Sequence, residues 1–93
     1  MSEQMRNIFK TELAPLSKLM YLYFCARADE EGRAAVRYKD IAKNLSIISA
    51  SSISRHTTAL VEAGLITKAR PMDEDGYVGS NVYTIRNWKG DKK

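Results

Sequence analysis

Apolar residues recur at helical spacing in the first third of the chain. Between residues 15 and 29 they lie three and four positions apart, at Leu16, Leu19, Met20, Tyr23 and Phe24. This spacing predicts a helix from Pro15 to about Asp29 whose apolar stripe faces the core. Proline suits the first turn, because its missing N–H has no helical acceptor there. Before it, Met5, Ile8, Phe9 and Leu13 predict a shorter amphipathic helix.

Two further helices are expected in the middle of the chain. Residues 39–45 place Ile41, Ala42 and Leu45 on one side, and the following segment 46–49 interrupts the helical pattern. Ser49 is a good N-cap, since its hydroxyl can accept a backbone N–H of the next turn. A third helix then runs from about residue 50 to residue 63, where Gly64 can close it in a left-handed conformation.

Three short segments are expected to be strands. Residues 65–70 and 81–85 read as the two arms of a hairpin around a polar, glycine-bearing loop. A hairpin of two strands alone is only marginally stable, and residues 34–38 could supply a third strand. The predicted order is therefore helix, short strand, helix, turn, helix, strand, loop and strand.

The third helix has two chemically different faces. At 100° per residue, one side collects Ile53, His56, Thr57 and Leu60, and the other collects Ser51, Arg55, Thr58 and Glu62. Small hydroxyl side chains and an arginine at the start of a helix suit the major groove of DNA, where bulky aliphatic residues would obstruct approach to the base edges. The alternative is a serine-rich start that caps the helix and faces water. Periodicity alone leaves both open.

Composition and charge fit one small domain with a mild attraction for polyanions. The 93 residues are 44% hydrophobic and 28% charged, with a net charge of +4. Residues 39–70 carry five basic and two acidic side chains, while the predicted loop carries only acids, at residues 73–75. The basic excess therefore lies around the second and third helices and in the tail, which favours a nucleic-acid partner.

The sequence contains no motif typical of catalysis or of metal binding. One cysteine, Cys25, and one histidine, His56, cannot form an internal disulfide or a tetrahedral zinc site. Both are expected to be packed side chains. Glycines in a nucleotide-binding pattern do not occur. We therefore expect no enzyme activity, no metal, no cofactor and no small-molecule ligand. The longest apolar run, residues 19–26, is too short to span a membrane, and the polar start is unlike a signal peptide, so a cytoplasmic location is expected.

Three stretches together resemble a known family. They are Tyr38–Leu45, Ser51–His56 and Ala59–Ile66, followed by the strand, loop and strand. They resemble a winged helix-turn-helix, and the end of the third helix is similar to the recognition helix of MarR-like regulators. The opening Leu16–Tyr23 resembles the first helix of short helix-turn-helix domains in bacterial, plasmid and phage regulators and replication initiators. The resemblance covers residues 14–87. It departs from the family in a longer turn at 46–49 without glycine and in an acidic wing tip.

The resemblance implies a mainly α fold with a small β-hairpin, as a three-helix core with a two- or three-stranded antiparallel wing. It also implies sequence-specific binding to double-stranded DNA, by a transcriptional regulator or a replication-initiation domain. The third helix would enter the major groove and present Ala50, Ser51, Ser54, Arg55 and Thr58, with Ser52 capping the helix or touching phosphate. Phosphate would be neutralised by Lys39, Lys43, Lys68 and Arg70. The alternative function is a winged-helix module that docks proteins and ignores DNA.

Three parts of the chain are expected. Residues 1–14 form an N-terminal segment, residues 15–87 form the domain, and residues 88–93 form a basic tail that Trp88 anchors on the hairpin. The stretch from Met5 to Leu13 either supplies a homodimer surface or packs on its own domain.

Overall fold

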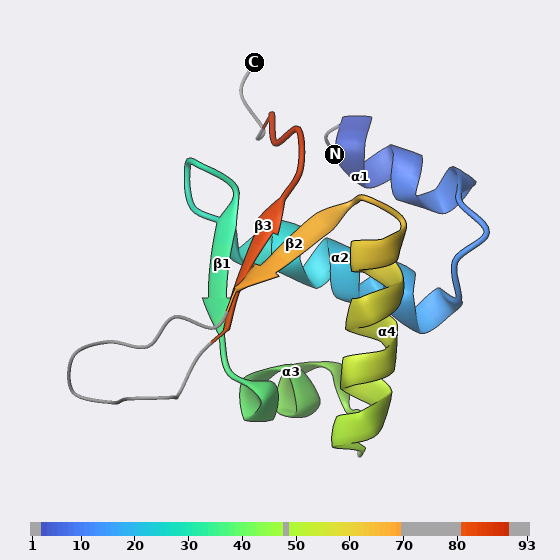
Figure 1. Ribbon diagram of the computed structural model, residues 1–93, viewed down its shortest axis with the longest axis vertical. Helices are drawn as coiled ribbons and strands as arrows, with labels where there is room; N and C mark the ends of the chain where they lie inside the picture. The colour runs from blue at the N-terminus through green and yellow to red at the C-terminus, as the bar shows by residue number, and fades with distance from the viewer. Residues whose placement is uncertain (1–2, 48, 70–80, 90–93) are drawn as a thin grey trace.

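The order of elements along the chain agrees with the sequence pattern. The structure, a computed structural model, describes residues 3–47, 49–69 and 81–89, and of Ala50 the backbone alone. The elements are α1 (Glu3–Asn7), the 3₁₀ helix η1 (Ile8–Lys10), α2 (Pro15–Arg27), β1 (Arg33–Val36), α3 (Tyr38–Leu45), α4 (Ala50–Glu62), β2 (Ile66–Ala69) and β3 (Asn81–Ile85) (Figure 1).

The three strands form one antiparallel sheet with the order β1-β3-β2. In this register, Tyr83 of β3 lies between Ala34 of β1 and Lys68 of β2. Alternate residues of β3 are buried, at Asn81, Tyr83 and Ile85, so one face of the sheet packs on the helices. The expected third strand is thereby confirmed.

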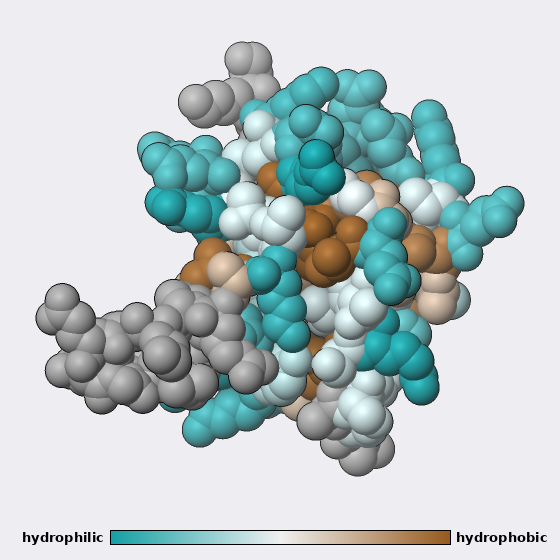
Figure 2. All heavy atoms as spheres, viewed as in Figure 1, coloured by the Kyte–Doolittle hydropathy of each residue, from teal (hydrophilic) through white to brown (hydrophobic). Residues whose placement is uncertain are grey.

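The core lies where α2 crosses the sheet and α4 (Figure 1). Phe24 of α2 stacks on Tyr83 of β3 with ring centroids 4.4 Å apart, and both side chains are fully buried. Stacked aromatic pairs add about 0.5–1.5 kcal/mol beyond the area they bury. Figure 2 shows apolar surface between β2 and α4, framed by hydrophilic side chains. The sheet therefore fixes α2, and α2 in turn supports α4.

The face that α2 buries is shifted from the predicted stripe by about one residue. The buried side chains are Ser17, Met20, Tyr21, Phe24 and Cys25, whereas Leu19 is 44% exposed. Leu16 and Tyr23 are half-buried. The prediction that Leu19 faces the core was wrong because α2 is apolar on nearly every side, so its periodicity alone cannot select the buried face.

The N-terminal segment forms α1 and η1 rather than one helix from 5 to 13. Ile8 is buried in the core of its own domain, and Met5 and Leu13 pack against that core, while Phe9 is 54% exposed. Gln4 joins this segment to the end of β3: its amide donates to the Arg86 carbonyl at 3.0 Å and accepts from the Lys89 N–H at 2.8 Å.

Trp88 closes the end of the sheet beyond β3. It packs against Gly32, in the turn that precedes β1, where the backbone has φ +82°. A Cβ added at Gly32 would lie 2.6 Å from the Cβ and Cγ of Trp88, so only glycine fits this turn. Trp88 was expected to anchor the tail on the hairpin, but it packs on the turn before β1 instead; residues 90–93 lie outside the described residues.

These elements give a mostly helical molecule with a small three-stranded antiparallel sheet, which confirms the predicted fold class and is consistent with a winged helix-turn-helix. In the part of the chain that the structure describes, no helix has the length and apolar character needed to cross a bilayer.

Candidate nucleic-acid interface

The start of α4 is held by serine side chains. Ser49 has extended backbone geometry, and its hydroxyl accepts the Ser52 N–H at 3.3 Å, which confirms the predicted N-cap. The hydroxyls of Ser49 and Ser51 lie 2.8 Å apart and share a hydrogen bond. Both side chains are exposed. The first turn of α4 therefore presents hydroxyl groups to solvent beside the positive end of the helix dipole.

The two faces of α4 are those that the sequence predicts. Ile53, Thr57 and Leu60 are buried. The polar side chains Ser51, Arg55, Thr58 and Glu62 are exposed, as is Val61, and Ser52 and Ser54 are half-buried. The side chain of Ala50 lies outside the described part. A shallow groove runs along the exposed face and is lined by Ser54, Arg55, Thr58, Ala59 and Glu62.

The opposite face of α4 is fixed to α2 by a polar contact. The fully buried Ser17 hydroxyl lies 3.0 Å from Nδ1 of His56. Because Ser17 and His56 are 39 residues apart, neither residue reveals this pairing in the sequence. The expectation that His56 is a hydrogen-bonded, packed histidine is confirmed. This contact limits rotation of α4 about its axis and so keeps Arg55 on the exposed side.

Two predicted phosphate contacts lie on α3. Lys39 and Lys43 are exposed and one turn apart, and therefore share a face. The helix ends at Ser46, which takes the left-handed conformation (φ 58°) that glycine usually supplies in this turn. The Ile47 side chain that follows is buried in the core and fixes the turn between α3 and α4.

A hydroxyl-centred contact fixes α3 against α2. The Tyr23 hydroxyl accepts hydrogen bonds from Nη1 of Arg27 and Nδ2 of Asn44, each at 2.9 Å. Arg27 and Tyr23 belong to α2 and Asn44 to α3, so this contact helps set the angle at which α3 meets the rest of the domain.

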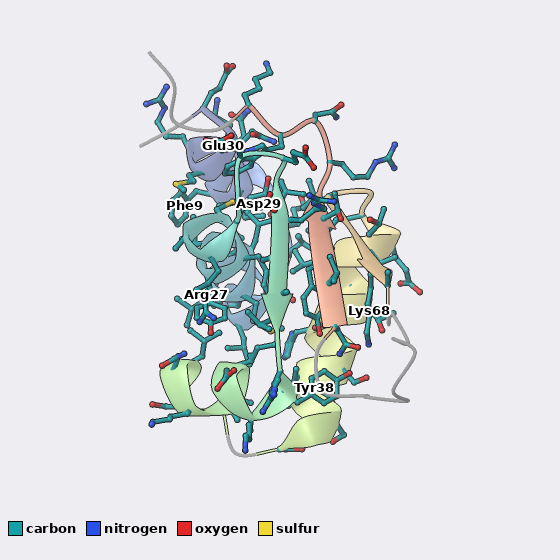
Figure 3. All side chains as sticks on the ribbon, turned by 90° about the vertical axis from the view of Figure 1, so that its left-hand side faces the viewer. Phe9, Arg27, Asp29, Glu30, Tyr38 and Lys68 are labelled. Carbon is teal, nitrogen blue, oxygen red and sulfur yellow. The ribbon has the colours of Figure 1, made fainter. Side chains whose placement is uncertain are left out.

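Lys68 joins the sheet to the start of α3. Its Nζ donates to the Tyr38 hydroxyl at 3.0 Å and lies 5.4 Å from the centre of the Tyr38 ring (Figure 3). The hydrogen bond uses one of the three ammonium protons, and Lys68 remains exposed. The lysine is thereby held close to α3, and its remaining protons can still reach a phosphate.

Two residues of this surface were not among the predicted site residues. Tyr38 positions Lys68. This role was hard to predict from the sequence, because a tyrosine at the start of a helix ordinarily packs at the edge of the core. Glu62 ends the exposed face of α4, and the helical projection had already placed it there. The negative charge of Glu62 would repel DNA phosphates at this end of the shallow groove on α4. Arg70 and the acidic residues 73–75 lie outside the described residues.

The predicted residues that the structure describes gather at one end of the molecule. α3 and the first turns of α4 lie together at the end opposite α1 and the end of β3 (Figure 1). Hydroxyls, an arginine and exposed lysines suit contacts to base edges and phosphates. Within residues 3–47, 49–69 and 81–89, no group of histidine, cysteine and acidic side chains could hold a metal ion.

This arrangement of α2, α3 and α4 defines a helix-turn-helix domain. The sequence pattern of the family described as "Helix-turn-helix domain" matches residues 11–66, more than half of the chain, and the chain belongs to that family. Membership indicates DNA binding. Searches of curated proteins and of solved structures found no match.

Proposed function

We propose that this protein binds double-stranded DNA in a sequence-dependent manner, with α4 in the major groove. The exposed face of α4 carries the argument: Ser51, Arg55 and Thr58 project from it, and the core holds the opposite face. The major groove is about 12 Å wide and admits one helix. Arg55 can bond the O6 and N7 atoms of guanine together, while serine and threonine hydroxyls can reach bases or phosphates.

Phosphate contacts on both sides of α4 would set its register on the duplex. Lys39 and Lys43 approach from α3, and Lys68 approaches from β2 under the control of Tyr38. Ser52 has its backbone N–H in the cap of α4, so it fits a phosphate contact better than a base contact.

The biological role that fits is a transcriptional regulator or a replication-initiation DNA-binding domain. Both need specific binding, and one such domain contacts few base pairs, so two copies on a two-fold site would raise specificity. The N-terminal segment could join the copies. Since Ile8 is committed to its own core, Phe9 is the apolar side chain of this segment that remains available to a second copy.

Binding to duplex DNA is tested by fluorescence anisotropy with a random-sequence duplex, followed by selection from a random library. We expect binding at low salt that weakens as salt rises, because phosphate contacts release counterions. Selection should then enrich one sequence. A protein-docking module would leave the duplex free at every salt concentration, and that result would overturn the proposal.

The dimer is tested separately by sedimentation at micromolar concentration, with Phe9→Ser as the variant. We expect a dimer mass for the parent and a monomer mass for Phe9→Ser. A monomer mass for the parent, with and without the selected duplex, would contradict the dimer and leave DNA binding intact.

A further inference from the structure

A cavity lies at the end of the molecule away from α3. Four parts of the chain line it: the N-terminal segment, α2, the turn after α4, and the residues that follow β3. Figure 1 shows the N-terminal segment, the turn after α4 and the end of β3 at this end of the molecule. The volume of the cavity is about 280 Å³, close to the lower end of the range for small-molecule sites. Its apolar lining consists of the half-buried Leu65 and of Ile8 and Tyr21, which are almost fully buried.

The charged residues in the lining of this cavity are both basic and both exposed. Arg86 and Lys89 enter the lining, and no carboxylate accompanies them among the described residues around the cavity. Neither cation forms an ion pair with another described residue. The amides of Asn7 and Asn87 add neutral hydrogen-bonding groups, while the Gln4 amide and the Thr11 hydroxyl in the lining already bond to the backbone. This combination would favour a ligand with one negative charge and a short apolar body.

A purely structural role accounts for part of this arrangement. Nη1 of Arg86 would lie 3.8 Å from a Cβ placed on Gly64, so the guanidinium sits close to the C-terminal end of α4, where the helix dipole favours a cation. That role needs one cation and no cavity. It explains neither the second basic residue, Lys89, nor the cavity itself.

We propose that this cavity binds a small organic anion, whose carboxylate or phosphate group lies near Arg86 and Lys89 and whose short apolar body contacts Leu65. The ligand would hold the N-terminal segment and the end of α4 together, in parallel with the existing Gln4 contacts to Arg86 and Lys89. The inference does not depend on DNA binding, because the lysines of the DNA interface lie on α3 and β2 and none lines the cavity.

The test is a ¹H–¹⁵N NMR titration of the full chain with benzoate, phenyl phosphate and the neutral isostere benzamide. We expect saturable shifts at the amides of Gly64, Leu65 and Asn87 with the anions and none with benzamide. The preferred anion identifies the acidic group. Arg86→Gln and Lys89→Gln should each weaken binding about tenfold, as expected when one charge-assisted contact is lost.

Lys39→Gln is the matched control, since it removes one positive charge on α3 and should leave the titration unchanged. The spectrum of each variant before ligand addition reports whether it is folded, and Lys89→Gln keeps the backbone contact to Gln4. Equal shifts with benzamide, shifts spread over Lys39 and Lys43, or no saturable shift in the parent would each overturn the proposal. None of these outcomes bears on the duplex-binding experiment.

Discussion

At the scale of single residues, α4 separates two tasks on opposite faces. Arg55 is exposed and Thr57, two positions later, is buried. If α4 binds DNA as proposed, a substitution at Arg55 should change affinity, and one at Thr57 should change how the helix packs. Stability and affinity can be tested independently in this helix.

Arg55→Ala should weaken binding to the selected duplex by about 1–3 kcal/mol and relax the preference at one base position. The reason is the loss of a bidentate contact to guanine. Anisotropy on the selected and random duplexes measures both effects, and the free energy of unfolding should change by less than about 0.5 kcal/mol because Arg55 is on the surface. Equal affinity of variant and parent for the selected duplex would remove Arg55 from base recognition.

Lys43→Ala supplies the contrast, because it should weaken binding to all sequences about equally and lower the slope of log affinity against log salt by about one. If it changed sequence preference instead, the assignment of Lys43 to phosphate would be wrong.

Thr57→Val should stabilise the fold. The Thr57 hydroxyl is buried and has no hydrogen-bond partner among the described residues. An unsatisfied buried hydroxyl costs about 1–3 kcal/mol, and valine has nearly the same shape. We expect a gain of about 1 kcal/mol in urea unfolding with unchanged duplex binding. A loss of stability would show that the hydroxyl has a partner in solution.

At the scale of the elements, the sequence predicted α4 better than α2 for a physical reason. The aliphatic residues Ile53 and Leu60 of α4 occupy one side and Ser51, Arg55 and Thr58 the other, so its buried and exposed faces follow from a helical projection. In α2 the charged residues are Lys18 and Arg27, and apart from Ser17 the other side chains are apolar or aromatic and lie on every side of the helix. Its buried face is chosen by tertiary contacts: the stacking of Phe24 on Tyr83 and the hydrogen bond between Ser17 and His56.

The candidate site, too, was predictable only where its residues follow from local spacing. Exposed residues of α4 and the lysines of α3 follow from local spacing, whereas the contact between Tyr38 and Lys68 joins positions 30 residues apart. Such a contact depends on strand register, which the hydrophobic pattern of a four-residue strand fixes only loosely.

The packing of α2 makes stability depend on pH through Tyr21. Burial, together with Cys25 beside it, raises the pKa of Tyr21 from 10.0 to about 12. The folded state therefore holds the phenol proton more tightly than the unfolded state. This contribution is fully present below pH 10.0 and is lost as the pH rises through about 12.

A two-unit difference corresponds to about 2–3 kcal/mol. Urea unfolding should show the parent losing about this much more stability than Tyr21→Phe over the same pH range. Parallel pH profiles for the two proteins would show that Tyr21 titrates normally in the folded state.

At the scale of the whole molecule, the sheet depends on its last strand. β3 is the central strand, and β1 and β2 each pair with it and not with one another. The family match ends at residue 66, before β3 begins. The stretch that carries the family pattern is therefore smaller than the unit that folds.

A fragment of residues 11–66 should lack a cooperative unfolding transition, because it leaves β1 without a partner and removes Tyr83 from the core. Thermal unfolding followed by circular dichroism compares it with a fragment of residues 1–89, which keeps all three strands and should unfold cooperatively. A cooperative transition in the shorter fragment would show that the helices alone suffice.

The position of Trp88 has a practical consequence. It is the single tryptophan of the chain, and it rests on a turn more than fifty positions earlier. Its fluorescence emission should therefore shift toward longer wavelength when this long-range contact opens and the indole meets water. The protein thus carries its own optical probe, with which the docking of Trp88 on the turn at Gly32 can be timed in a stopped-flow instrument without any added label.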